Sequence, residues 1–242
     1  MQLLQLSLDS AIKNVALDEA LLDQAEAAGR PTETLRLWES GQRAAIAGRS
    51  SALASEVDVD ACRRAGVEVV RRSSGGAAVV VGPGCLLYSL ILSYELRPDL
   101  RMIDRAHEFV LGRLAAALSR LAAGVVCAGT SDLAIEGRKF SGNSVRCKRT
   151  HFLYHGTVLY EMPLAWIGEL LRQPPRVPDY RRNRAHEQFV RHFPASRESI
   201  CQALVAAWSA GESAPAWPRE RVAELVRSKY SRPEWLAEGR AG

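Results

Sequence analysis

The sequence is poor in aromatic residues and contains no long hydrophobic run. Aromatic side chains make up 7% of the 242 residues, and they are not interleaved with the basic residues as in a groove that stacks nucleobases. Polar and acidic residues interrupt the apolar ones in the N-terminal stretch MQLLQLSLDSAIKN, so neither a signal peptide nor a membrane span is predicted. We therefore expect a cytoplasmic protein that binds neither nucleic acid nor a membrane. The formal net charge of +5 suits an acidic partner or a phosphate-bearing ligand.

The chain also lacks the cysteine spacings that build disulfide frameworks and zinc sites. Its five cysteines are scattered, without CxxC or Cys/His patterns, and stand at Cys62, Cys85, Cys127, Cys147 and Cys201. Reduced thiols are therefore expected. The phosphate-binding pattern GxxxxGK[ST] and internal repeats are absent as well, which excludes a P-loop enzyme and a solenoid.

Apolar residues alternate between helical and strand-like spacing along the chain. Helical spacing predicts helices at 14–27, 57–66 and 104–122, and in the stretches LAWIGELL and SRESICQALVAAWSA. Strands are predicted at 34–40, 44–48, 67–72 and 85–95, near Val125, and through LAIEGRKFSGNSV and HFLYHGTVLY. This order predicts an α+β protein in which a mostly antiparallel sheet is flanked by helices.

Turn residues predict two hairpins. One turns at Gly82-Pro83-Gly84, and the other turns at EGRK and places Lys139 at the start of its returning strand. The segment Val125 to Cys127 is interpreted as a strand entering the core, and Cys147 as part of a basic turn. Residues 1–210 are predicted to form one catalytic domain, and residues 211–242 a linker with a short C-terminal helical tail.

The first candidate site is the run RRSSGGAAV at residues 71–79. Small side chains let a ligand touch the backbone, whose N–H groups hold phosphate or carboxylate oxygens. The two arginines add charge-assisted hydrogen-bond donors. The alternative for this run alone is a tight turn beside a solvated strand end.

The second candidate site combines SDLAIEGRKFSGNS, residues 131–144, with the triplet HGT at 155–157. A lysine in a phosphate-lined pocket stabilises charge on a transferred nucleotidyl group, and an aspartate can hold Mg²⁺. Taken singly, Asp132, Lys139 and His155 also fit a turn aspartate, a surface lysine and a structural core histidine.

Together and in this order, the motifs resemble the lipoate-protein ligase family of the biotin/lipoate ligase superfamily. The resemblance begins with NVALDEAL at 14–21 and LRLW at 35–38, and runs through RRSSGGAAV, the Gly-Pro-Gly turn, SDLAIEGRKFSGNS and HGT. It implies a mixed sheet of the biotin/lipoate ligase catalytic-domain type. It also implies that ATP activates lipoate or octanoate to acyl-AMP, and that the acyl group passes to a lysine of a lipoyl carrier domain. An acyltransferase E2 subunit or the glycine cleavage H protein would be such a carrier.

The resemblance also implies roles for individual residues. Lys139 corresponds to the catalytic lysine, which contacts the acyl carboxylate and the α-phosphate, and Asp132 would lie near Mg²⁺. The residues expected to bind nucleotide and acyl-adenylate are Arg71, Arg72, Ser73, Gly75, Gly76, Ala77, Ala78, Val79, Asp132, Ser141, Gly142, His155 and Gly156. Too few residues follow Gly211 for the accessory domain of many ligases. This implies a self-sufficient domain, a separate accessory protein, or a reaction without ATP.

Two alternatives stay open at this point. An octanoyltransferase of the same fold would take its acyl group from an acyl carrier protein through a cysteine thioester, with Cys127 or Cys147 as the nucleophile. Basic residues near Lys139 would lower the pKa of such a thiol. The second alternative is a non-catalytic protein that binds lipoyl domains. The SDL and GRKFSGNS motifs favour the ligase.

Overall fold

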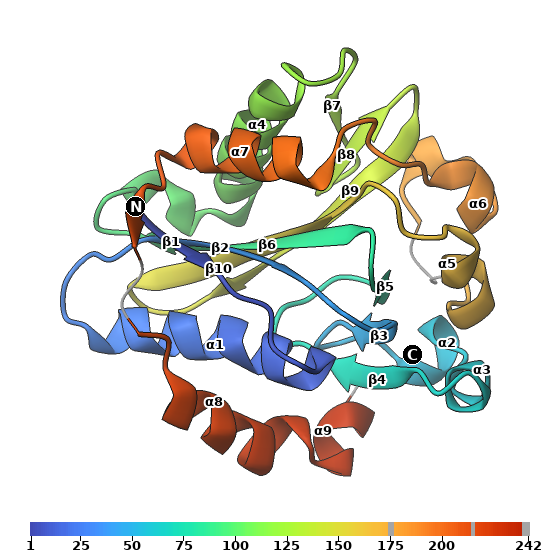
Figure 1. The fold of residues 1–242 in the computed structure, drawn as a ribbon, viewed down its shortest axis with the longest axis horizontal. Helices are drawn as coiled ribbons and strands as arrows, with labels where there is room; N and C mark the ends of the chain where they lie inside the picture. Colours follow the sequence, from blue (N-terminus) through green and yellow to red (C-terminus); the bar gives the residue numbers. More distant parts are fainter. Residues whose placement is uncertain (174–176, 214–215, 239–242) are drawn as a thin grey trace.

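A computed structural model describes residues 1–173, 177–213 and 216–238, and within them the strands form two sheets (Figure 1). The large sheet has the order β11 (Glu212–Ser213), β1 (Gln2–Gln5), β2 (Thr34–Glu39), β6 (Cys85–Ser93), β10 (His151–Leu159), β9 (Arg138–Cys147), β8 (Asp132–Ile135), β7 (Val126–Ala128). The small sheet has the order β4 (Glu68–Arg71), β3 (Ala44–Ala47), β5 (Val79–Val81). In the large sheet only β1 pairs in parallel, with β2 and with β11, so the sheet is mixed and mostly antiparallel, as predicted.

Helices cover both faces of the large sheet (Figure 1). On one face lie α4 (Ile103–Leu118) and α7 (Arg197–Trp208), and on the other lies α1 (Ala11–Ala27), beneath which run α8 (Arg219–Leu225) and α9 (Pro233–Ala237). The short helices α2 (Leu53–Glu56), α3 (Val59–Arg64) and α5 (Ala165–Leu170) lie near the small sheet, and α6 (His186–Phe189) contacts α5 and β9. The predicted α+β class is confirmed. In the described part of the chain, no helix has both the length and the apolar character to cross a membrane.

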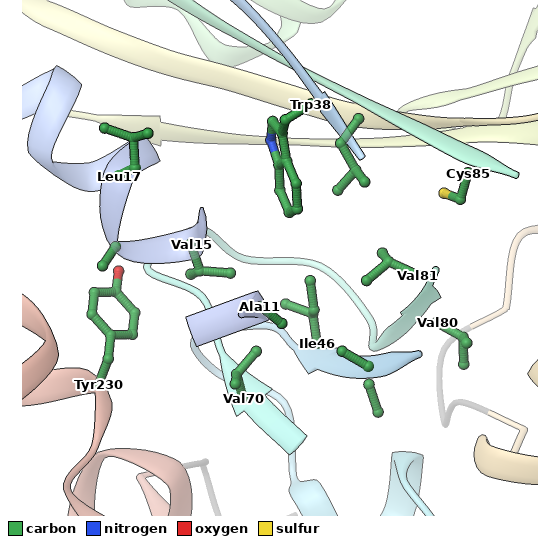
Figure 2. Packing of buried hydrophobic residues seen from close by; sticks show 14 of the residues in the cluster. Ala11, Val15, Leu17, Trp38, Ile46, Val70, Val80, Val81, Cys85 and Tyr230 are labelled. Carbon is green, nitrogen blue, oxygen red and sulfur yellow. The ribbon is translucent and has the colours of Figure 1, made fainter. Parts of the chain in front are cut away.

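The core has one apolar layer on each side of the large sheet. All nine residues of β6 are buried because this strand lies between β2 and β10 with helices on both sides. Figure 2 shows the layer on the α1 side, where Trp38 of β2 lies above Val15 of α1 and Ile46 of the small sheet. Since α1 is enclosed between the sheet and α8, even its polar residues Asn14 and Asp18 are buried and need partners inside the protein.

The hairpin predicted at Gly82-Pro83-Gly84 is wrong. Strand β5, before the turn, pairs with β3 in the small sheet, whereas β6, after it, pairs with β2 and β10 in the large sheet. The turn thus carries the chain from one sheet to the other. Gly84 has φ 88°, and its carbonyl accepts hydrogen bonds from the backbone of Tyr160, Glu161 and Met162, which anchors the crossing.

The interpretation of Val125 to Cys127 as a strand entering the core is also wrong. Strand β7 is the last strand of the large sheet, so Val126 is 50% exposed and Cys127 is exposed too. Cys147 is the exposed last residue of β9 and does not lie in a turn. The apolar letters VVC do not distinguish an edge strand from a central one.

The C-terminal residues pack closely onto α1 and β4. Val222, Leu225 and Tyr230 are buried in the layer that contains α1, and the Tyr230 hydroxyl points toward that helix (Figure 2). The Trp235 indole donates a hydrogen bond of 2.9 Å to the carbonyl of Arg71. Of the predicted linker GESAPAWP, residues 214 and 215 lie outside the described residues, and Glu212 and Ser213 extend the large sheet beside β1.

Candidate active site

One cavity of about 470 Å³ opens between the two sheets and the segment 177–190. Its apolar lining includes Val15, Trp38, Ile46, Val80, Leu87, Ile167, Leu171, Phe189 and Val190. Its charged lining includes Asp18, Glu56, Arg72, Asp132, Lys139, Arg172 and Arg181. Trp38 on β2 and Lys139 on β9 are separated by three strand spacings, roughly 14 Å. The cavity is therefore elongated, with apolar walls at β2 and charged groups at β8 and β9.

Lys139 stands on the hairpin of β8 and β9, which the EGRK pattern predicted and the structure confirms. Glu136 and Gly137 have φ 52° and 69°, the left-handed backbone of a two-residue turn between Ile135 and Arg138. Glycine takes this conformation without strain, which explains why the turn falls there.

A bulge in β9 decides which way Lys139 points. Gly142 pairs with Asp132, but Lys139 pairs with Ala134, so one extra residue lies between the two pairs on β9. Paired residues share a face, and therefore the bulge brings Lys139 to the same face as Asp132 and Gly142. A regular strand would have turned the lysine to the opposite face. Ser141 faces away from the cavity for the same reason and is 1% exposed.

The Lys139 ammonium is held by a carboxylate. Its Nζ lies 2.7 Å from Asp132 Oδ1, and the Tyr180 hydroxyl donates to Asp132 Oδ2 at 2.7 Å. Burial and the neighbouring carboxylate raise the pKa of Tyr180, so its hydroxyl keeps the proton that it donates. A Cβ on Gly142 would come within 2.7 Å of Lys139 Nζ. The glycine thus leaves the space in which the lysine lies.

The small-residue loop, residues 73–78, turns its carbonyl groups toward the protein. The carbonyl of Ser74 accepts from the Arg49 amide at 2.8 Å, that of Gly75 from Ser144 Oγ at 2.9 Å, and that of Gly76 from Ser51 Oγ at 3.1 Å. The Ala78 N–H donates to Glu56 Oε2 at 2.7 Å. Within the described residues, the N–H groups of Gly75, Gly76 and Ala77 have no hydrogen-bond partner. A run of unpaired N–H groups is suited to bind an anion.

The two arginines before this loop point in different directions. Arg71 donates to the carbonyls of Gly48, Ser51 and Leu236, so its guanidinium holds the C-terminal segment and does not line the cavity. Arg72 lines the cavity and donates to the loop itself, including the Ala77 carbonyl at 3.0 Å. Burial lowers the pKa of Arg72 to about 10, so this residue stays charged at neutral pH.

Arg181 brings a further cation to the cavity from the segment after α5. It is 3% exposed and lies over the Phe189 ring at 5.0 Å, and its Nε donates to the Arg184 carbonyl. Its Nη2 is buried without a hydrogen-bond partner among the described residues. A buried charged group in that state has a large desolvation cost, which an anionic ligand in the cavity would offset.

The structure brings together ten of the residues proposed from sequence. Those that line the cavity are Arg72, Gly76, Ala77, Ala78, Val79, Asp132, Lys139, Gly142, His155 and Gly156. Those that do not are Arg71, Ser73, Gly75, Ser141, Cys127 and Cys147. Sequence reasoning did not identify Glu56, Asn143, Tyr180 and Arg181 as site residues. The density of arginine in 181–184 was the available signal for Arg181. Asn143 lies within the GRKFSGNS motif, but no role was predicted for it.

Known proteins share this fold and sequence pattern. Residues 10–206 match the family model described as the lipoyl protein ligase A/B catalytic domain. A protein of Aeropyrum pernix that carries the name lipoate-protein ligase A is 30% identical over 198 residues, which cover 81% of this chain and 70% of the relative. The octanoyltransferase LipM of Carboxydothermus hydrogenoformans is 28% identical, with 94% of each chain covered. Of a Mycoplasma pneumoniae relative that also carries the name lipoate-protein ligase A, this chain matches 45% of the length at 27% identity.

Solved structures agree on the fold. An archaeal bi-partite lipoate protein ligase of Thermoplasma acidophilum, studied with its E2 lipoyl domain, superposes with a TM-score of 0.82 at 21% identity over 100% of this chain and 98% of that one. A lipoate-protein ligase A bound with ATP superposes with a TM-score of 0.80 at 21% identity, covering 98% of each chain. The match over residues 10–206 makes this chain a member of the lipoyl protein ligase A/B catalytic-domain family. That family includes ligases and octanoyltransferases among the relatives named above.

Proposed function

We propose that the protein is an ATP-dependent lipoate-protein ligase. The carboxylate of lipoate or octanoate would attack the α-phosphate of ATP, releasing pyrophosphate and forming acyl-AMP, and the acyl group would then pass to a lysine of a lipoyl carrier domain with release of AMP. The observation that carries the proposal is the composition of the cavity, in which apolar walls meet a lysine, a buried unpartnered arginine nitrogen and unpaired backbone N–H groups. A fatty acid joined to a nucleotide has the matching chemistry, an apolar chain followed by a phosphate.

The apolar part of the cavity suits the acyl chain. Trp38 and Ile46 are almost fully buried, so a chain packed against them would be removed from water and gain about 0.8 kcal/mol per CH₂ group. We expect an eight-carbon chain to extend from these walls toward Lys139, across the three strand spacings between β2 and β9. A short polar acid would leave this surface uncovered.

The charged part of the cavity suits the activation step. Lys139, freed from Asp132, would lie between the acyl carboxylate and the α-phosphate and would stabilise the negative charge that builds there. Arg181 and the loop N–H groups would hold the remaining phosphate oxygens. In the second step the carrier lysine attacks the acyl carbon, AMP leaves, and the same groups hold the departing phosphate. The protein orients the reactants and supplies no covalent group.

Magnesium fits the cavity less well. Both oxygens of Asp132, the predicted metal ligand, are occupied by Lys139 and Tyr180. Among the described residues there is no cluster of three or more histidine, cysteine, aspartate or glutamate side chains that could hold a metal ion. Mg²⁺ bound with a nucleotide needs only one or two carboxylates. The carboxylate predicted to bind the metal is thus already paired on both oxygens.

The octanoyltransferase alternative needs a cysteine near Lys139. No cysteine among the described residues lines the cavity. Cys147 is eight residues from Lys139 along β9, about 26 Å in an extended strand. Cys127 lies on the exposed edge strand, and burial of its sulfur raises the pKa of its thiol, which opposes thiolate formation. The positions of both cysteines outside the cavity favour the ligase, although the LipM relative aligns over 94% of each chain.

The partner proposed for the second step is a lipoyl carrier domain. Support comes from the relative named octanoyl-[GcvH]:protein N-octanoyltransferase, 30% identical over 66% of this chain, and from the Thermoplasma ligase studied with its E2 lipoyl domain. A separate accessory protein is part of the proposal, which the name bi-partite, given to the Thermoplasma ligase, supports. If the protein only bound lipoyl domains without catalysis, the pair of Lys139 and Asp132 in the cavity would have no role in a reaction.

The activation step can be tested without any carrier. Lipoate-dependent exchange of labelled pyrophosphate into ATP is expected with the wild-type protein and lost in Lys139→Ala. The matched control is Lys13→Ala, an exposed lysine paired with Asp9 at the surface, which should exchange at the wild-type rate. Exchange that is absent from the wild type, both alone and with an added accessory protein, would contradict the ligase proposal.

A further inference from the structure

His155 joins helix α1 to the small-residue loop. Its Nδ1 lies 3.2 Å from Asp18 Oδ2, and its Nε2 lies 2.5 Å from Ser74 Oγ. Both ring nitrogens are therefore used inside the protein. Although the ring lines the cavity, it offers no nitrogen to a ligand, and its contribution to the site must pass through Ser74.

Asp18 is held in one position by a buried cation. Arg36 Nη1 lies 2.6 Å from Asp18 Oδ1, and the two side chains are 0% and 4% exposed. The same nitrogen also donates to the Asn14 carbonyl, while Nε and Nη2 donate to the Leu6 carbonyl and Nη2 donates to Asn14 Oδ1 as well. The arginine is thus fully partnered and cannot rotate without breaking several hydrogen bonds at once.

The negative charge of Asp18 determines which ring nitrogen of His155 carries the hydrogen. Burial alone would raise the pKa of Asp18, but the attraction of Arg36 and the hydrogen bond from His155 bring that pKa below its ordinary value. The carboxylate can only accept, so His155 Nδ1 carries the hydrogen. In the neutral imidazole, Nε2 is then the acceptor for the Ser74 hydroxyl.

Ser74 is fixed at both its side chain and its backbone. Arg72 Nε donates to the Ser74 hydroxyl at 3.0 Å, which leaves the hydroxyl proton for His155, and the Ser74 carbonyl accepts from the Arg49 amide at 2.8 Å. The peptide that follows Ser74 therefore has one orientation. That orientation determines where the Gly75 N–H points, and the next peptide, which carries the Gly76 N–H, is held by Ser144 Oγ, which donates to the Gly75 carbonyl at 2.9 Å.

We propose that Asp18 is a positioning residue for the small-residue loop, acting through His155 and Ser74. The chain Asp18–His155–Ser74 links α1, β10 and the loop, and holds the loop with its unpaired N–H groups in an anion-binding arrangement. The inference rests on the proposed function only where the loop is taken to hold the phosphate of the substrate.

A double-mutant cycle tests the linkage. Calorimetry would measure ATP binding to the wild type, Asp18→Asn, Ser74→Ala and the double variant, all at pH 8. Each single variant should weaken binding about tenfold, the effect of one lost hydrogen bond in the chain. Because both substitutions break the same chain, the double variant should bind no more weakly than the weaker single variant.

Ser40→Ala is the matched control, since Ser40 is also buried and its hydroxyl donates to a backbone carbonyl, that of Gln42. Ser40→Ala should leave ATP binding unchanged, and the double variant Asp18→Asn/Ser40→Ala should bind ATP as Asp18→Asn alone does. Additive losses from Asp18→Asn and Ser74→Ala would overturn the proposal, because a merely structural role of Asp18 predicts additivity.

A second readout needs no ligand. In ¹⁵N-labelled protein at pH 8, His155 should show a protonated Nδ1 and an unprotonated Nε2, and Ser74→Ala should shift the amide signals of Gly75 and Gly76. The opposite tautomer in the wild type would overturn the chain. If the wild type binds no ATP, the proposed function fails, and these signals still decide the role of Asp18. If the amide signals of Gly75 and Gly76 shift in Ser74→Ala but stay at their wild-type positions in a folded Asp18→Asn variant, the positioning role of Asp18 is wrong.

Discussion

The buried pair of Arg36 and Asp18 gives a prediction of lost stability whose size depends on pH. Replacing Arg36 by methionine keeps most of the side-chain volume but leaves the Asp18 carboxylate buried without its cation. Removal of one partner of a buried ion pair costs ~3–5 kcal/mol. The variant should therefore lose at least this much of its free energy of unfolding at pH 7.5, since the hydrogen bonds of Arg36 to Leu6 and Asn14 are lost as well.

The loss should shrink in mild acid. In the wild type the pKa of Asp18 is lowered by Arg36, so its ionised form adds stability above the unfolded pKa of ~3.9, and this contribution disappears only below that pH. Without Arg36, burial raises the pKa of Asp18 instead. The folded variant then takes up a proton as the pH falls, and each unit of raised pKa returns ~1.4 kcal/mol on acidification toward pH 4.

Denaturation by guanidinium, followed by tryptophan fluorescence at pH 7.5 and pH 5.0, measures both effects. Arg105→Met is the matched control, because Arg105 is an exposed helix residue paired with Glu108, and it should change stability by less than ~0.5 kcal/mol at either pH. A loss below ~1 kcal/mol in Arg36→Met, or a loss of the same size at both pH values, would refute the reasoning about this pair.

Three further substitutions, the last with a control variant, have expected outcomes. Gly142→Ala places a Cβ 2.7 Å from Lys139 Nζ, so acyl transfer should fall at least about tenfold while the melting temperature stays near that of the wild type, because only the flexible end of a lysine must move. Tyr180→Phe removes a hydrogen bond to the charged Asp132. Because Tyr180 positions the segment 177–190 and does not touch the reacting atoms, KM for ATP should rise in steady-state assays while kcat stays within about threefold of the wild-type value. Gly84→Ala puts a Cβ 2.1 Å from the Met162 amide at φ 88°, so calorimetric unfolding should show a loss above ~2 kcal/mol, whereas Gly112→Ala, in open space within α4, should gain up to ~1 kcal/mol.

The β8–β9 hairpin shows how far the sequence leads. Glu136-Gly137 between two apolar runs specifies a tight turn, and so the place of Lys139 at the start of β9 was predictable. The bulge after Lys139 was not, because no letter pattern in RKFSG marks the extra residue. Yet this bulge determines that the lysine faces the cavity and that Ser141 does not.

The adjacent residues Arg71 and Arg72 show the limit for side-chain direction. Both were assigned to the nucleotide site from sequence, but alternation along β4 and the nearby C-terminal segment turn Arg71 toward Leu236. Likewise Asp18 and Arg181 are distant in sequence from the loop and from Lys139. Only the enclosure of α1 beneath the sheet and the packing of 177–190 against β9 bring them into contact with the site.

The apolar letters around the cysteines misled in a similar way. Val125 to Cys127 has the composition of a buried strand, but its place in the sheet depends on the strand order, which the sequence does not contain. Since β7 is last in that order, Val126 and Cys127 are exposed, and Cys127 lies outside the cavity. The choice between the two reactions therefore depends on topology more than on motif.

Acyl transfer to a purified apo-lipoyl domain, read by intact mass, tests the central claim most directly. One tube would contain lipoate, ATP and Mg²⁺, and the other octanoyl-acyl carrier protein without ATP, each with wild type, Lys139→Ala, Cys127→Ala and Cys147→Ala. A gain of lipoyl mass only in the first tube, lost in Lys139→Ala and kept in both cysteine variants, is the predicted result. Transfer in the second tube alone, abolished by one cysteine substitution, would contradict the adenylate mechanism and make the protein an octanoyltransferase.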